Sequence, residues 1–266
     1  MMGQAQVASL YRHPVKGFTP ESVDEAVLIA DGFFPFDRLY ALEVGPCGFD
    51  PATPKTISKM KFAVLARFPS VARLNTRYNE VSHRFEIHQG ADSIVSFNLK
   101  DEGGAAELAH FVEAILAQHE DYDPVVQPLN LLQSPESAQP FRFTDSGKGF
   151  VSFLNLNSLR DLSGRVGMDL DPLRLRANMW VEGWEPFADH DWVGRTLRLG
   201  DDGPEFEVLK PIVRCIATHV NPQTAERDID LCTALWENYG HRDCGIYGRV
   251  IKGGVVRPGD ALHLVA

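Results

Sequence analysis

The chain has 266 residues, 44% hydrophobic and 23% charged, and its formal net charge is −10. This is ordinary globular composition in a chain long enough to bury a large core. The acidic balance argues against a general nucleic-acid binder, which carries a basic face. No apolar run approaches the ~20 residues that cross a bilayer, and the N-terminus lacks the pattern of a secretory signal. We therefore expect a cytoplasmic protein with no nucleic-acid and no membrane partner.

The four cysteines are widely spaced and form no Cys-x-x-Cys pair. This spacing argues against a zinc ribbon or an iron–sulfur cluster, and so few cysteines in a long chain argue against a disulfide framework. The nine histidines are dispersed, with no paired ligand spacing. We expect each of them, His219 included, to be structural or exposed.

Short apolar runs bounded by turn residues dominate the first half of the chain. They predict strands at residues 7–11, 23–30, 36–44, 71–77, 84–88 and 94–99. Residues 45–58 are rich in Pro and Gly and predict a loop. Residues 105–119 predict a helix, because apolar residues recur there at the spacing of one buried face. Residues 121–148 hold prolines without periodicity, so we place a boundary at their start, between domains 1–120 and 121–266.

The second half shows a similar pattern of short strands with two helices. A helix is expected to begin at an N-cap on Asn157 or Ser158 and to end near Gly164 or Gly167. A second short helix is expected at residues 231–239, stopped by a glycine. Many short strands and few helices predict an α+β, β-rich fold with at least one barrel-like sheet. The strands of this half are expected at residues 151–155, 174–181, 197–199, 206–209, 244–251 and 261–265.

Cys215 is the candidate reactive residue. It directly follows Arg214, lies between apolar residues and precedes the Asn-Pro turn signal at 221–222. A thiolate attacks electrophiles and binds soft metals, and a neighbouring cation favours that form. The turn signal predicts that Cys215 ends a strand or begins a loop, where reacting groups are usually found. The alternative is a small buried hydrophobic residue, the commonest role of a free cysteine.

Isolated basic residues suggest an anionic ligand beside this thiol. Lys16 stands in a Pro-Val-Lys-Gly segment, Arg38 in a short predicted strand, and Arg176 within an otherwise apolar strand candidate. A charge in an apolar strand is costly unless it is paired or faces a pocket. Taken singly, each is also compatible with a surface cation or a local ion pair. Taken together with Arg214, they predict a site for a phosphate-bearing ligand, to which the helix start near residue 157 would add backbone donors.

These motifs resemble the MOSC-domain family, named for the C-terminal domain of molybdenum cofactor sulfurases. Residues 10–17 and 36–38 resemble the β-barrel module that precedes many such domains. Within the family the chain is most similar to the amidoxime-reducing components and their bacterial relatives. The resemblance implies an N-terminal β-barrel-like module followed by a MOSC β-barrel domain with a few helices. The MOSC part of the resemblance lies in residues 175–179, 185–189, 192–194, 214–218, 245–250 and 256–260.

The resemblance also implies a cofactor and its ligands. Cys215 matches the cysteine that supplies a thiolate ligand to the molybdenum of the molybdenum cofactor (Mo-molybdopterin). Two positions depart from the family pattern, since Gly17 stands where some relatives have Ser and Asn221 where relatives often have Asp. The remaining cofactor-binding residues that the resemblance implies are Lys16, Gly17, Arg38, Asn157, Ser158, Arg176, Val213 and Arg214.

The implied activity is that of a molybdenum-cofactor-dependent reductase, an oxidoreductase acting on N-hydroxylated or related N-oxygenated small molecules. The chain carries no flavin or nicotinamide fingerprint, so we expect electrons to come from a separate electron-transfer protein. One alternative is a sulfur carrier or transferase that uses a Cys215 persulfide received from a sulfur donor. Another is a carrier of the molybdenum cofactor without turnover.

Overall fold

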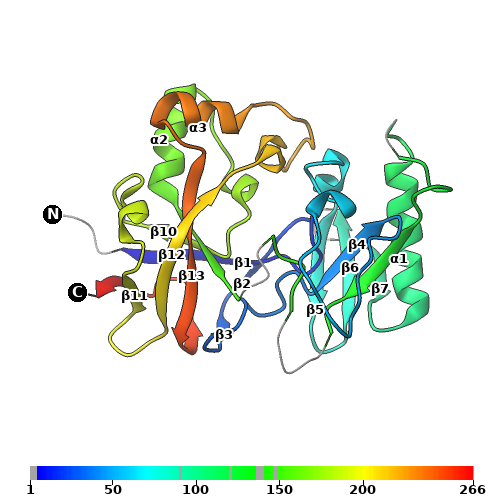
Figure 1. Ribbon diagram of the computed structural model, residues 1–266, viewed down its shortest axis with the longest axis horizontal. Helices are drawn as coiled ribbons and strands as arrows, with labels where there is room; N and C mark the ends of the chain where they lie inside the picture. The colour runs from blue at the N-terminus through cyan, green and yellow to red at the C-terminus, as the bar shows by residue number, and fades with distance from the viewer. Residues whose placement is uncertain (1–4, 90–91, 120–121, 136–140, 146–148, 266) are drawn as a thin grey trace.

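The computed structural model describes residues 5–89, 92–119, 122–135, 141–145 and 149–265. Its elements form two lobes that lie side by side (Figure 1). The larger lobe contains the longest sheet, with α2 (Leu156–Val166) and α3 (Leu231–Tyr239) at one end of it. The smaller lobe has α1 (Glu102–Leu116) on its outer side. No helix in the described part of the chain is long and apolar enough to span a membrane.

The sheet of the larger lobe has eight strands in the order β15-β11-β12-β13-β9-β10-β1-β2 among the described residues. Neighbouring strands are antiparallel except β9 and β10, which run parallel. Its core includes Val7 and Leu10 of β1, which lie three residues apart because the register of the strand shifts between Val7 and Ser9. The strands are β1 (Gln6–Arg12), β2 (Glu21–Val23), β9 (Val151–Asn155), β10 (Met179–Glu182), β11 (Thr196–Leu199), β12 (Glu205–Val213), β13 (Asp243–Lys252) and β15 (Leu262–Val265).

The smaller lobe packs α1 against two short antiparallel sheets, with the order β5-β6-β7 in one and the pair β4-β8 in the other. The buried face of α1, which includes Leu108 and Val112, joins the core of this lobe. The strands are β4 (Tyr40–Val44), β5 (Asn75–Asn79), β6 (Arg84–Gln89), β7 (Asp92–Asn98) and β8 (Leu129–Gln133).

Strand pairing crosses the predicted boundary between residues 120 and 121. β1 belongs to the first segment, yet it lies between β10 and β2 in the larger sheet. β3 (Ala26–Leu28) likewise pairs with β14 (Gly254–Val256) near the other end of the chain. The two lobes therefore differ from the two sequence segments, because the first strands of the chain complete the sheet that later residues build.

The predicted α+β, β-rich fold is confirmed, with local corrections. A closed barrel is not found among the described residues, where β15 and β2 end the sheet order without pairing with each other. The strand expected at 23–30 is two short strands, β2 and β3, separated at residues 24–25. The strand expected at 174–181 is shorter, because the turn η3 (Pro172–Leu175) precedes it. The first turn of α2 is capped by Asn155, whose side chain accepts a hydrogen bond from the Asn157 amide, so neither predicted N-cap is correct.

Candidate functional site

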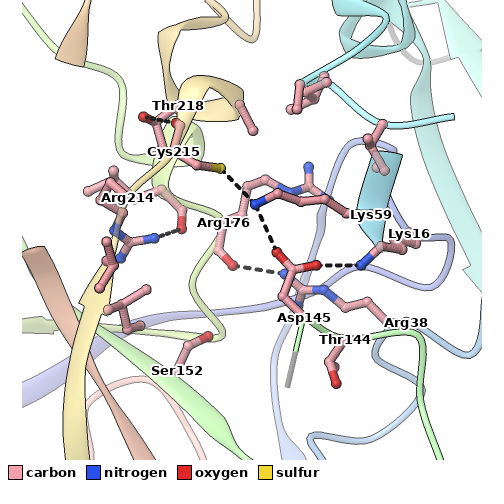
Figure 2. Close-up of a pocket in the computed structure, with 18 of the residues that line it drawn as sticks. Lys16, Arg38, Lys59, Thr144, Asp145, Ser152, Arg176, Arg214, Cys215 and Thr218 are labelled. Carbon is pink, nitrogen blue, oxygen red and sulfur yellow. Dashed lines mark hydrogen bonds and ion pairs between the residues drawn. The ribbon is translucent and has the colours of Figure 1, made fainter. Parts of the chain in front are cut away.

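A cavity between the two lobes brings together residues from both halves of the chain. Cys215, the residue singled out in the sequence, lies in its wall just after β12 and begins the turn η5 (Ile216–His219), as the Asn-Pro signal predicted. Figure 2 shows the thiol facing basic side chains of the smaller lobe. The predicted site residues that line the cavity are Lys16, Gly17, Arg38, Arg176, Val213, Arg214 and Cys215.

The cation next to the Cys215 thiol is Lys59, whose ammonium group lies 3.1 Å from Sγ (Figure 2). The same ammonium lies 3.4 Å from Oδ2 of Asp145, and Lys16 donates to Oδ1 of Asp145 at 2.6 Å. Burial raises the pKa of Asp145, but Lys16 and Lys59 outweigh it and hold this pKa at about 2. One ionised carboxylate therefore positions two lysines at the cavity wall.

Lys59 and Asp145 were not predicted as site residues. Lys59 lies on the turn η1 (Lys59–Lys61), directly after the Pro- and Gly-rich loop expected at 45–58. A basic residue at the end of such a loop is a signal that could have suggested it, because loops held by a rigid scaffold often carry functional side chains. Asp145 lies in the stretch without periodicity, where the sequence has no comparable signal.

Arg38 and Arg176 form a second basic group, and both occupy left-handed backbone positions with φ of 49° and 52°. Arg38 donates to the carbonyl oxygen of Arg176 at 3.1 Å and to the carboxylate of Asp37 at 2.5 Å. Arg176 donates to the carbonyl oxygen of Phe18 at 2.8 Å, and no carboxylate among the described residues pairs with it. Burial, with the nearby Arg38 charge, lowers the pKa of Arg176 to about 9. This guanidinium is a half-buried cation at the cavity wall, without an ionic partner in the described part of the chain.

Asp37 and His13 support this group from behind. The Asp37 carboxylate accepts a hydrogen bond from the His13 amide at 2.8 Å and lies 3.4 Å from the His13 ring. Burial raises the pKa of Asp37, but the Arg38 and His13 neighbours outweigh it and hold this pKa well below its ordinary value. Asp37 is therefore the fixed counter-charge for Arg38 and does not form an ion pair with Arg176.

The Arg214 guanidinium hydrogen-bonds to backbone carbonyl oxygens. It is buried and donates to the carbonyl oxygens of Cys244 at 2.8 Å and Leu175 at 2.7 Å. Burial lowers the pKa of Arg214. The residue next to Cys215 in sequence thus fixes backbone carbonyls behind the cavity, while the ammonium beside the thiol comes from the other lobe.

The backbone at Gly17 closely approaches the segment that follows η1. A Cβ atom at this position would lie 2.3 Å from the carbonyl oxygen of Ala63, and its φ of +92° also favours glycine. This contact gives a packing reason for glycine where some relatives have serine. Val213 ends β12 and is 66% exposed, so it borders the cavity through an apolar side chain.

Asn157 and Ser158 are not among the described residues that line the cavity. The Asn157 side chain donates to the carbonyl oxygen of Trp184 at 2.8 Å, and the Ser158 hydroxyl accepts from the Phe187 amide at 2.8 Å. Both residues thus join the first turn of α2 to the segment after β10. The structure assigns them contacts within the larger lobe and gives no geometric support to a cofactor contact.

Two family models match the chain. The MOSC domain matches residues 142–263, and the MOSC N-terminal beta barrel domain matches residues 4–122. Together they extend across both lobes, and the chain belongs to the family of MOSC-domain proteins that carry this N-terminal domain.

Curated relatives include two proteins named molybdenum cofactor sulfurase. One from Caenorhabditis briggsae is 32% identical over 43% of this chain, and one from Caenorhabditis elegans is 35% identical over 40%. The matched region spans only 16% of the length of each relative.

Matches among solved structures include the YUAD protein from Bacillus subtilis and YiiM from Geobacillus stearothermophilus. The first has a TM-score of 0.43 at 13% identity, covering 98% of this chain and 94% of that one. The second has a TM-score of 0.35 at 22% identity, covering 44% of this chain and 54% of that one.

Proposed function

We propose that the cavity binds the molybdenum cofactor, with Cys215 as a ligand to the metal, and that the protein reduces N-hydroxylated or related N-oxygenated small molecules. Electrons would come from a separate redox protein. The observation that carries the proposal is the position of one thiol in a cavity with a surplus of buried positive charge. The names of the curated relatives support a function connected with the same cofactor.

The charges that line the cavity fit an anionic ligand. Six basic side chains and two carboxylates line this cavity, although the whole protein is acidic. One of the six, Arg174, is paired with Asp228 at 2.7 Å, which leaves five cations for the two carboxylates of the lining. An unpaired buried cation is costly, so a cavity with such a surplus is complementary to a bound anion such as phosphate. The thiol adds the soft donor that a molybdenum centre needs. The basic residues are Lys16, Arg38, Lys59, Arg174, Arg176 and Arg214, and the carboxylates are Asp37 and Asp145.

Several residues of the cavity wall then have definite tasks. Arg176 and Arg38 bind phosphate oxygens with a geometry that a planar guanidinium fork suits. Lys59 donates to Sγ of Cys215, and Asp145 holds Lys59 and Lys16 at the wall. The cofactor, when bound, supplies the removal of the oxygen atom from the substrate and the exchange of electrons.

Sulfur transfer is the second candidate function. The position of Cys215 in the cavity wall supports it, since a cysteine sulfur is the atom that accepts a transferred sulfur atom to form a persulfide. In this reaction Cys215 attacks the outer sulfur of a donor persulfide, the donor leaves as a thiolate, and no external oxidant is needed. A third candidate is a cofactor carrier without turnover.

The first experiment measures molybdenum and pterin in the full chain purified from a cofactor-competent host. We expect near-stoichiometric metal in the wild type and in the control Cys47→Ser, and loss of metal in Cys215→Ser, because a neutral hydroxyl is a poor ligand for this metal. Turnover of an N-hydroxylated amidine with a chemical reductant then supports the reductase. Metal that remains bound in Cys215→Ser together with full turnover would refute the ligand assignment.

A mass-spectrometric arm separates the two chemistries. Extra sulfur on the peptide containing Cys215, found without reductase turnover, would favour sulfur transfer. The peptides containing Cys47, Cys232 and Cys244 serve as internal controls. Cofactor binding without turnover and without added sulfur would favour the carrier.

Lys59→Met tests the contact between the lobes, with Lys61→Met as its matched control on the same turn. We expect Lys59→Met to lower turnover at least tenfold, since removal of a charge-assisted donor costs about 1.5–3 kcal/mol. The side chain of the exposed Lys61 does not line the cavity, so its variant should retain turnover. Equal effects of the two substitutions would contradict this role of Lys59.

A further inference from the structure

A second cavity opens beside Cys215, on the side of η5 and α3. It contains three side chains with metal-binding atoms that the proposed function does not use: His219 at the end of η5, and Asp230 and Cys232 at the start of α3. One nitrogen, one carboxylate oxygen and one sulfur from these residues all lie within 4.8 Å of one another. Nothing in the sequence spacing indicated this group, because His219 and Cys232 come from different elements.

The separation of two of the three donors suits a tetrahedral metal ion. His219 Nε2 and Asp230 Oδ1 are 3.2 Å apart. In a tetrahedral zinc site, bonds of ~2.0–2.2 Å to nitrogen and oxygen put these two ligand atoms about 3.3–3.5 Å apart. A His, Cys and carboxylate set is also the donor chemistry that Zn²⁺ prefers among the common divalent ions.

Local structure holds the three donors in place before any metal binds. Asp230 caps α3 by accepting hydrogen bonds from the backbone and hydroxyl of Thr233, both at 2.9 Å. The Cys232 amide lies 3.4 Å from His219 Nε2, which ties the start of the helix to η5. The side chains of His219 and Asp230 are 12% and 59% exposed. The imidazole is therefore mostly buried, and the carboxylate is open to solvent.

A simple ion pair between His219 and Asp230 explains only part of this arrangement. Capping accounts for the position of Asp230, and packing of the buried Cys232 accounts for its side chain. Neither capping nor packing explains why a thiol, an imidazole and a carboxylate lie close together in the wall of one cavity. Three protein donors with a fourth position left open is the ligand arrangement of catalytic zinc sites.

We propose that His219, Asp230 and Cys232 bind a Zn²⁺ ion, and that its fourth position faces the cavity and takes water or a small ligand. Binding forms a bond between the metal and the Cys232 sulfur and releases the thiol proton to solvent, with no change of oxidation state. The ion links η5, which directly follows Cys215, to α3. This cavity adjoins the proposed cofactor cavity and shares Cys215 and Lys59 with it. None of the three donors lines the cofactor cavity, so metal binding here can be tested independently of the proposed function.

The test titrates the full chain, freed of metals by chelator, with Co²⁺ as a spectroscopic substitute and then displaces it with Zn²⁺. We expect thiolate-to-metal charge-transfer absorption in the wild type, in Cys47→Ser and in Cys215→Ser. The absorption should vanish in Cys232→Ser, and Zn²⁺ affinity should fall at least about tenfold in His219→Gln. Proton release on binding should be lost in Cys232→Ser as well.

Asp230→Asn is the most discriminating variant, because Asn caps a helix as well as Asp does but is a weaker metal ligand. We expect it to keep the thermal stability of the metal-free protein and to lose the stabilisation that Zn²⁺ gives the wild type. Absence of thiolate absorption in the wild type at saturating Co²⁺ would overturn the proposal. So would absorption that survives in Cys232→Ser and disappears in Cys215→Ser, since that result assigns the metal to the other thiol.

Discussion

Arg214→Met tests whether the buried guanidinium supports the backbone behind the cavity. The side chain donates to the carbonyl oxygens of Cys244 and Leu175, and methionine can donate to neither. A buried carbonyl left without a partner costs about 1–3 kcal/mol, so the two lost contacts amount to roughly 2–6 kcal/mol. Removing a buried cation recovers part of its desolvation cost, as the lowered pKa of Arg214 indicates.

We therefore expect the free energy of unfolding to fall by about 2–4 kcal/mol, with little further cost from lost volume because methionine is also long. In a urea titration this is a shift of the midpoint by roughly 1 M. The control is Arg195→Met, at an exposed arginine, which should change stability by less than about 0.5 kcal/mol. An unchanged midpoint in Arg214→Met, combined with lost anion binding, would refute the structural role and restore Arg214 as a direct ligand-binding residue.

Three further predictions concern pH, packing and anion binding. Burial and neighbouring guanidinium groups hold the pKa of His13 well below its ordinary value, so the folded state keeps it neutral while the unfolded chain binds a proton below about pH 6.5. As pH falls below this value, the free energy of unfolding of the wild type should decrease by about 1.4 kcal/mol per pH unit more than that of His13→Gln, as measured in denaturant titrations. The same pH dependence in both proteins would contradict this. Gly245→Ala should lower the free energy of unfolding by at least about 2 kcal/mol, because φ is +79° and the new Cβ would lie 2.3 Å from the Phe153 carbonyl oxygen. The control Gly164→Ala places its Cβ in open space, so its free energy of unfolding should be unchanged or higher in the same titrations. Arg176→Ala should weaken pyrophosphate binding about tenfold or more in calorimetry. Its loss of stability should be smaller than that of Arg214→Met, because only the Phe18 carbonyl loses its donor and removal of an unpaired cation offsets part of that cost; an equal loss would show that this cation is structural.

Much of the secondary structure could be predicted from the sequence, and the physical reasons are local. The apolar face of α1, the glycine that ends α3 and the turn signal after Cys215 are each contained in a few neighbouring residues. The strand β8 could not be predicted, because its residues show no alternation and pair with β4 from far earlier in the chain. Asn155 was missed as the cap of α2 because it also ends a fully buried strand, and its neighbours had the same capping ability.

The residues of the candidate site likewise include some that local sequence predicts and some that only the tertiary structure reveals. The sequence by itself determined that a cysteine would lie at a strand end and that isolated cations would need a pocket or a partner. Only the tertiary structure decided which cation meets the thiol: Lys59 from the other lobe, and not Arg214 beside it, is 3.1 Å from Sγ. It also excluded Asn157 and Ser158 from the cavity wall and brought His219 to Cys232. Sequence patterns report on turns and faces because those depend on nearby residues, whereas contacts between lobes depend on how the sheets pair and pack.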